Sequence, residues 1–194
     1  MVTDLKKNIE KAEIEQLPLF VFPGEVVVIE DAENADQAAA FLRQQKYLGF
    51  DTETRPAFHK GESYKVGLLQ LSTQDQVYLF RLNKCGFGGA LRHLLEASDI
   101  MKIGVGIRDD IRNLRKSGEF TPASFVDLQD YAVKFGIEDK SFSKLMAIIF
   151  GVKISKRQRT SNWDAQELTE AQIRYAATDA WGALKMYQRL STAV

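Results

Sequence analysis

Two acidic residues end the apolar run YLGF (47–50), and their spacing is the first feature of the chain that could do chemistry. Asp51 and Glu53 are separated by one residue, and side chains at positions i and i+2 of a strand project from the same face. Two carboxylates held side by side repel each other unless a cation lies between them. The pattern therefore predicts a cation-binding position where this strand ends.

A second acidic pair, Asp109 and Asp110, lies in the segment IGVGIRDDIRNL (103–114). Its apolar residues recur at helical spacing and form a stripe that is expected to face the core, namely Ile107, Ile111 and Leu114. At about 100° per residue, Asp110 falls at the edge of this stripe and Asp109 points away from it. We expect Asp110 to be the inward acid, although both are equally typical of a solvated first helical turn.

A third candidate pair, Tyr175 and Asp179, is separated by four residues in the segment IRYAATDAWGALKMY (173–187). This spacing stacks the two side chains on one face of a helix. Small residues surround them, including Gly182, and a glycine inside a helix costs about 1 kcal/mol relative to alanine, so close packing against a neighbour is expected. Taken alone, the pair is also typical of an ordinary hydrogen bond at a helix edge.

Considered together, the four acids Asp51, Glu53, Asp110 and Asp179 suggest a different role from the one that each suggests alone. Each lies where a buried or half-buried face is expected, and unpaired buried carboxylates are costly. No matching set of lysines or arginines lies at interior positions, so divalent cations would resolve the conflict. Ligation by oxygen alone selects Mg²⁺ or Mn²⁺. Two such ions about 4 Å apart are a known device for cleaving phosphodiesters.

The elements that must hold these acids form an α/β pattern. Three strand-like segments come in hairpin order, and later strands alternate with helices, which suggests a mixed sheet covered by helices. The expected strands are 25–30, 47–54, 64–74, 76–80, 101–106 and 124–128. The expected helices are 34–46, with Asn34 or Asp36 as its cap, 89–98, 108–118, 141–150 and 169–192.

Composition and length exclude several classes of protein. The 194 residues are 45% hydrophobic and 27% charged, with 26 basic and 26 acidic residues, which suits one soluble domain without a global basic field. A single cysteine, Cys85, and two histidines leave no basis for a disulfide or a zinc site. No apolar segment approaches the roughly 20 residues of a membrane span, and no secretory leader is visible, so we expect a cytoplasmic protein.

Three segments together resemble the exonuclease motifs of the DEDD superfamily, in the subclass with a tyrosine in the last motif. They are FDTET, GVGIRDD and YAATD, in this order along the chain. The run SKRQRTSNWDAQELTEAQIRYAATDA, including Ser161-Asn162-Trp163, also resembles the approach to the third motif. The resemblance covers roughly residues 25–192 and is greatest to exonuclease domains of the Werner type, with the ribonuclease D type more distant.

The resemblance implies a ribonuclease H-like fold with a mixed five-stranded central sheet flanked by helices. It implies that Asp51, Glu53, Asp110 and Asp179 hold two divalent ions, Mg²⁺ or Mn²⁺, and that the Tyr175 hydroxyl orients the attacking water. The implied reaction releases nucleoside 5′-monophosphates from a 3′ end. Residues 1–24 would form an N-terminal arm or helix, and residues 25–194 the 3′-5′ exonuclease domain. Thr54 and Arg55 depart from the aromatic residue and lysine often found after the first acid pair.

The substrate is expected to be a nucleic-acid 3′ end, with DNA ahead of RNA. Four basic residues of a loop could grip phosphates or could equally be a solvated surface, namely Lys153, Lys156, Arg157 and Arg159. Phe58, Leu68 and Leu69 could stack on bases, although core packing suits the leucines better, and Trp163 suits a packing role. The alternatives are a ribonuclease D-like RNA exonuclease and a catalytically inactive binding or scaffold module.

Overall fold

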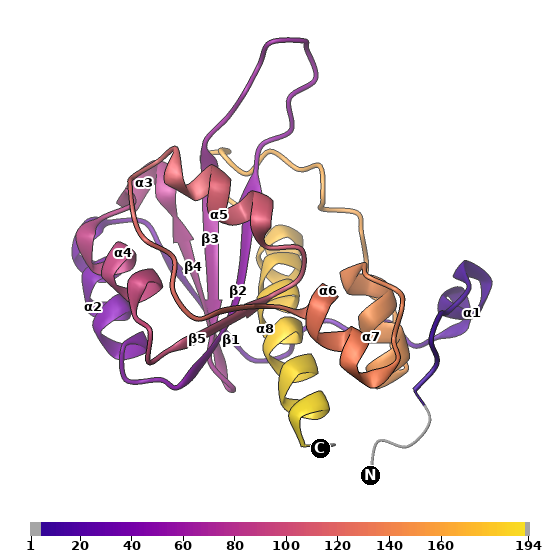
Figure 1. The fold of residues 1–194 in the computed structure, drawn as a ribbon. Coiled ribbons are helices and arrows are strands. Elements are labelled where there is room, and N and C mark those ends of the chain that lie inside the picture. The colour runs from indigo at the N-terminus through magenta and orange to yellow at the C-terminus, as the bar shows by residue number, and fades with distance from the viewer. Residues whose placement is uncertain (1–4, 193–194) are drawn as a thin grey trace.

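The computed structural model describes residues 5–192. The first four residues of the expected N-terminal arm and the last two of the chain, 193–194, lie outside this range. A central sheet is flanked by helices, and one long loop projects beyond it (Figure 1). No helix within 5–192 combines the length and apolar character that crossing a membrane requires.

The sheet has six strands in the order β1-β4-β3-β2-β5-β6. Antiparallel pairing joins β2 to β3 and β3 to β4, whereas β1–β4, β2–β5 and β5–β6 are parallel. The strands are β1 (Glu25–Ile29), β2 (Tyr47–Thr54), β3 (Val66–Ser72), β4 (Gln76–Arg81), β5 (Met101–Gly104) and β6 (Phe125–Asp127). The mixed α/β architecture is confirmed. The strand number implied by the resemblance is wrong by one, because the three-residue β6 also pairs with β5 at the edge.

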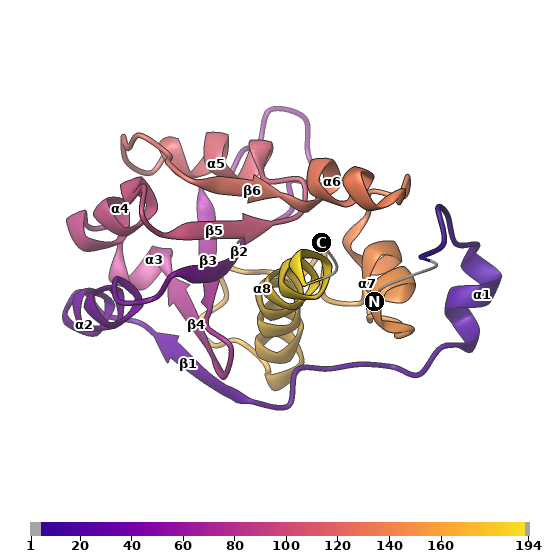
Figure 2. The same cartoon turned by 60° about the horizontal axis from the view of Figure 1, so that its bottom comes forward.

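Helices cover both faces of the sheet. One face carries α2 (Ala32–Leu42), α3 (Leu82–Cys85), α4 (Gly89–Glu96) and α5 (Arg108–Arg115). The other carries α6 (Leu128–Tyr131), the 3-10 helix η1 (Ala132–Phe135), α7 (Phe142–Phe150) and α8 (Glu170–Ser191). The short α1 (Lys11–Gln16) lies outside these layers (Figure 2).

Helix α2 begins three residues earlier than the expected cap allows. Asp31 is the N-cap, and its carboxylate accepts a hydrogen bond from the main-chain N–H of Asn34 at 2.9 Å. An acceptor at this position satisfies a donor that the first helical turn leaves unpaired. The prediction of Asn34 or Asp36 as the cap is therefore wrong.

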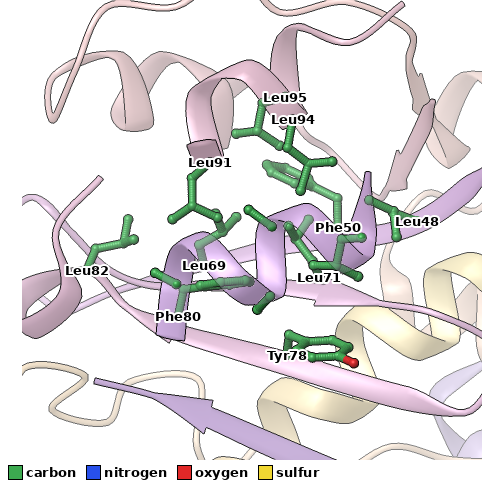
Figure 3. Packing of buried hydrophobic residues seen from close by; sticks show 14 of the residues in the cluster. Leu48, Phe50, Leu69, Leu71, Tyr78, Phe80, Leu82, Leu91, Leu94 and Leu95 are labelled. Carbon is green, nitrogen blue, oxygen red and sulfur yellow. The ribbon is translucent and has the colours of Figure 1, made fainter. Parts of the chain in front are cut away.

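The alternation of β2 divides its side chains between the two layers. Leu48 and Phe50 are fully buried and pack against Leu91, Leu94 and Leu95 of α4 (Figure 3). Gly49, Asp51 and Glu53 therefore point to the opposite face, which α8 covers (Figure 2). A strand whose one face is locked into an apolar core has a fixed register, so the direction of its two acids is fixed as well.

Close contact between α8 and β2 depends on small residues. A side chain at Gly49 would overlap the carbonyl oxygen of Ala180 and the hydroxyl of Ser72. Helix α8 begins at a capping box in which Thr169 accepts from the N–H of Gln172 and the Gln172 side chain accepts from the N–H of Thr169. Because α8 has a well-capped N-terminus and lies directly on the backbone of β2, Asp179 is held at the level of Asp51.

Candidate active site

A cleft of about 290 Å³ lies where β2 ends. Its wall is built from β2, α8, the start of α7 and the chain between α7 and α8. The residues that line it include three of the four predicted acids, the predicted tyrosine and two of the predicted basic residues, namely Asp51, Glu53, Asp179, Tyr175, Lys156 and Arg159.

Three carboxylates converge in this cleft. Asp51, Glu53 and Asp179 each place an oxygen within 4.8 Å of the other two. Burial raises the pKa of Asp51 well above its usual range, and the charges of neighbouring carboxylates, Asp179 first, raise it further. Burial, together with the same neighbours, raises the pKa of Glu53 to about 9, and burial raises that of Asp179 to about 7. Such a cluster is poorly stabilised by the protein alone and is suited to a divalent cation.

Asp110 lies next to this group. On α5, its carboxylate accepts a hydrogen bond from the hydroxyl of Thr52, the residue between the two acids of β2. Burial raises the pKa of Asp110, and the hydrogen bond from Thr52 opposes that shift. The adjacent Asp109 is exposed and pairs with Arg112 at 2.8 Å, so the two acids of this turn have different surroundings. The sequence did not single out Thr52, because only the fold brings α5 against β2.

Tyr175 is held between the acids and a buried indole. Its ring centroid is 6.1 Å from that of Trp163, which is fully buried. The packing role expected for Trp163 is therefore confirmed. The Tyr175 hydroxyl is close enough to Asp179 to lower the pKa of that carboxyl by hydrogen bonding. Burial and then the neighbouring carboxylates raise the pKa of Tyr175, so its hydroxyl keeps its proton.

The segment that carries Trp163 is anchored by a buried guanidinium. Arg81, at the end of β4, is 1% exposed and donates hydrogen bonds to the carbonyl oxygens of Ala165 and Gln166. From the other side, the amide of Gln172 donates to the carbonyl of Asn162 at 3.2 Å. These contacts fix the chain on either side of Trp163. Sequence reasoning missed Arg81, which has no distinctive neighbours in the chain.

The four predicted basic residues are not equivalent. Lys156 and Arg159 line the cleft, and the charge of Arg159 counteracts part of the pKa shift of Glu53. Arg157 lines a neighbouring hollow of about 450 Å³, which it shares with Tyr175. Lys153 is turned away, because its ammonium donates to the carbonyl of Glu15 at 2.7 Å and its main chain pairs with residues 18–20.

The apolar candidates for base contacts also divide. Leu68 and Leu69 are fully buried in the core, so the core-packing alternative is confirmed for both. Phe58 is 78% exposed, on the loop that follows β2. A residue the sequence did not indicate is Gln70, which pairs with Asp51 across the β2–β3 ladder and is fully buried. Its side-chain nitrogen and oxygen have no hydrogen-bond partner among residues 5–192.

Comparisons with known proteins agree with this arrangement. The sequence pattern of the 3′-5′ exonuclease family matches residues 26–194. The bifunctional 3′-5′ exonuclease/ATP-dependent helicase WRN of Mus musculus is 34% identical over 97% of this chain and 14% of its own length. Ribonuclease D of Gluconacetobacter diazotrophicus is 31% identical over 84% of this chain and 42% of its own length. The chain thus spans less than half the length of these two relatives.

Solved structures establish the fold independently. The Nibbler EXO domain of Aedes aegypti superimposes with a TM-score of 0.79 at 22% identity, covering 89% of this chain and 91% of that one. RNase D of Escherichia coli gives a TM-score of 0.78 at 22% identity, covering 87% of this chain and 44% of that one. The expected ribonuclease H-like fold is confirmed. The chain belongs to the 3′-5′ exonuclease family.

Proposed function

We propose that this chain is a metal-dependent 3′-5′ exonuclease that hydrolyses the terminal phosphodiester of a nucleic acid and releases nucleoside 5′-monophosphates. The observation that carries the proposal is the convergence of Asp51, Glu53 and Asp179 within 4.8 Å in an open cleft. A group of buried carboxylates with raised pKa values lowers the stability of the fold, and such groups are typical of functional sites. In this proposal residues 25–194 form the exonuclease domain and residues 1–24 its N-terminal arm.

The donor set fits hard divalent cations. We assign Asp51, Glu53, Asp110 and Asp179 as the ligands of two ions, Mg²⁺ or Mn²⁺, since all available donors are oxygens. Bound ions of this kind lower the pKa of water and offset the negative charge that develops on the phosphate. Asp110 would keep its hydrogen bond from Thr52 on one carboxylate oxygen and offer the other oxygen to a metal ion.

The protein's own side chains supply orientation and phosphate binding. The Tyr175 hydroxyl stays protonated, so it orients the attacking water and does not act as its base. The water oxygen forms a bond to phosphorus while the bond to the 3′ oxygen of the preceding nucleotide breaks, which leaves a new 3′ hydroxyl. Lys156 and Arg159 hold phosphate oxygens at the cleft. Arg157 and Lys153 would take phosphates farther along the strand, Lys153 only after it leaves Glu15.

DNA is the proposed substrate ahead of RNA, because the higher identity is to the exonuclease/helicase WRN. The similarity to a ribonuclease D supports an RNA exonuclease as the second candidate. An inactive binding module is the third, and the presence of all four acids and the tyrosine argues against it. We further propose that the protein acts in the cytoplasm.

The test is degradation of a 5′-labelled oligonucleotide, supplied as DNA and as RNA, with Mg²⁺, Mn²⁺ or chelator. The proposal predicts a metal-dependent ladder that shortens from the 3′ end, is lost in Asp51→Ala and is strongly slowed in Tyr175→Phe. Asp109→Asn is the matched control, since Asp109 lies beside Asp110 but is exposed and paired with Arg112. The faster polymer identifies the substrate class. If folded protein with metal present gives no ladder on either polymer, the proposed exonuclease activity is refuted.

A further inference from the structure

A loop formed by residues 55–65 projects from the end of the sheet that carries the acids (Figure 1). It begins two residues after Glu53. Its base is closed by a cation–π contact, in which the Arg55 guanidinium lies 4.7 Å from the ring centroid of Tyr64. The backbone at Gly67, just beyond the loop, packs against Trp163 and Asp164. The loop therefore extends, on a fixed base, from the end of β2 that carries Asp51 and Glu53.

The tip of the loop presents an aromatic ring to solvent. Phe58 is 78% exposed, more than any other large apolar side chain within residues 5–192. The turn that follows it is defined, because the N–H of Glu62 donates to the carbonyl of His59 at 3.2 Å and Gly61 has φ +93°. Burying a phenylalanine contributes about 1.5–3 kcal/mol, so this ring leaves apolar surface in water that a ligand could cover.

Basic residues accompany this ring. The loop contains Arg55, Lys60 and Lys65 against the single acid Glu62, although the whole chain has equal numbers of basic and acidic residues. Across residues 5–192, no salt bridge involves any of these three basic side chains. An exposed aromatic ring near cations that form no salt bridge is the combination that binds single-stranded nucleic acid, by stacking on bases and by contact with phosphates.

The length of the loop determines which nucleotide it can reach. Phe58 follows Glu53 by five positions, and an extended chain spans at most about 3.4 Å per residue, so the two Cα atoms lie within about 17 Å of each other. Successive nucleotides of a stacked strand are about 3.4 Å apart. Phe58 can therefore touch a base up to about the fifth nucleotide from the bond that is cleaved.

We propose that the loop 55–65 is a substrate-binding element in which Phe58 stacks on a base upstream of the cleaved nucleotide, while Arg55, Lys60 and Lys65 contact the adjacent phosphates. This assignment rests on the proposed function for the position of the cleaved bond. The loop would make the enzyme prefer long strands and keep them bound between successive cleavages. A dinucleotide offers the loop only one base upstream of the cleaved bond, so its cleavage should depend least on Phe58.

The experiment compares wild type with Phe58→Ala in two measurements. The first is binding of a fluorescent single-stranded 20-mer by anisotropy in chelator, where no cleavage occurs. The second is kcat/KM with Mn²⁺ on substrates of two, five and twenty nucleotides. The control is Phe41→Ala, because Phe41 is also exposed, at 43%, but lies on α2 away from the loop (Figure 1).

The proposal predicts that Phe58→Ala weakens 20-mer binding at least about fivefold, the lower end of what one stacked base contributes. It also predicts an equal loss of kcat/KM on the 20-mer, a smaller loss on the dinucleotide, and no effect of Phe41→Ala. Unchanged binding of the 20-mer, or equal losses on both substrate lengths, would overturn it. If wild type cleaves nothing, the proposed function fails, and the binding measurement still decides the role of the loop.

Discussion

The indole of Trp163 lies against the ring of Tyr175, with centroids 6.1 Å apart and the ring planes inclined by 33°. Trp163 is fully buried, and Arg81 and Gln172 hold the chain on either side of it. The Tyr175 ring thus has an apolar support on one side and the carboxylates on the other. A side chain that must orient a water molecule gains from such support, because small displacements of catalytic groups cost large factors in rate.

A double-mutant cycle tests this support. Tyr175→Phe should lower kcat about 100-fold, the cost of a misplaced reacting group, and Trp163→Phe should lower it by a smaller factor. If Trp163 acts through Tyr175, the double variant should be no slower than Tyr175→Phe alone. Steady-state kinetics on one oligonucleotide measure all four proteins. Losses that simply multiply would show that Trp163 acts on the whole fold and not on the tyrosine.

The raised pKa values predict how the metal-free protein responds to pH. The folded state holds protons on Glu53 up to about pH 9 and on Asp179 up to about pH 7, whereas unfolded carboxyls lose theirs near pH 4. Unfolding therefore releases protons between these values, and stability falls as pH rises through this window. Melting in chelator should show a Tm several degrees lower at pH 8 than at pH 5.

Two controls accompany that measurement. Asp179→Asn removes one of the groups, so in chelator at pH 8 it should be more stable than wild type by on the order of 1–3 kcal/mol. Saturating Mn²⁺ should raise the Tm of wild type at pH 8 and leave that of the variant nearly unchanged. A wild-type Tm that rises from pH 5 to pH 8 in chelator would contradict the account of the cluster.

Gly49 should be intolerant of substitution because α8 lies directly on its backbone. In Gly49→Ala the methyl group overlaps the carbonyl oxygen of Ala180, so α8 must shift relative to β2. The free energy of unfolding should fall by about 1–3 kcal/mol, and activity should fall because Asp179 moves relative to Asp51. Gly89→Ala is the control, since a methyl group there meets open space. Equal stability of the two variants would show that the contact is relaxed in solution.

Arg159 and Lys153 have different surroundings, so their substitutions should change the salt dependence of nucleic-acid binding differently. Arg159 lines the cleft, so Arg159→Gln should remove about one phosphate contact and reduce the slope of log affinity against log salt by about 0.7 for a single strand. Lys153→Gln should change the slope less than Arg159→Gln does, because Lys153 must first leave the carbonyl of Glu15 to reach a phosphate. Binding titrations in chelator at several salt concentrations measure both. A larger change in slope for Lys153→Gln than for Arg159→Gln would indicate that the strand passes the N-terminal end of the segment 153–159.

Local periodicity was sufficient to predict much of the site. The alternation of β2 indicates that Asp51 and Glu53 share a face, and the i, i+4 spacing places Tyr175 beside Asp179 in α8. These relationships depend only on the geometry of one element. The apolar patterns of the strands and of the long C-terminal helix are strong enough to predict these elements as well.

Contacts between distant segments could not be predicted. Whether Lys153 faces the cleft depends on Glu15, which is 138 residues away in the chain. The hydrogen bond from Thr52 to Asp110 and the support of the 162–166 segment by Arg81 likewise arise from packing. The cap of α2 was misplaced for a different reason, since Asp31, Asn34 and Asp36 are all good capping residues and the sequence does not rank them.

The central claim is that Asp51, Glu53, Asp110 and Asp179 bind the divalent ions on which strand cleavage depends. The most direct test titrates Mn²⁺ into wild type and Asp51→Asn, follows bound metal by electron paramagnetic resonance, and measures single-turnover cleavage on the same samples. We predict that cleavage rises with bound Mn²⁺ in wild type and that Asp51→Asn, folded by circular dichroism, loses both. Cleavage in wild type without bound metal, or full metal binding by Asp51→Asn, would contradict the account.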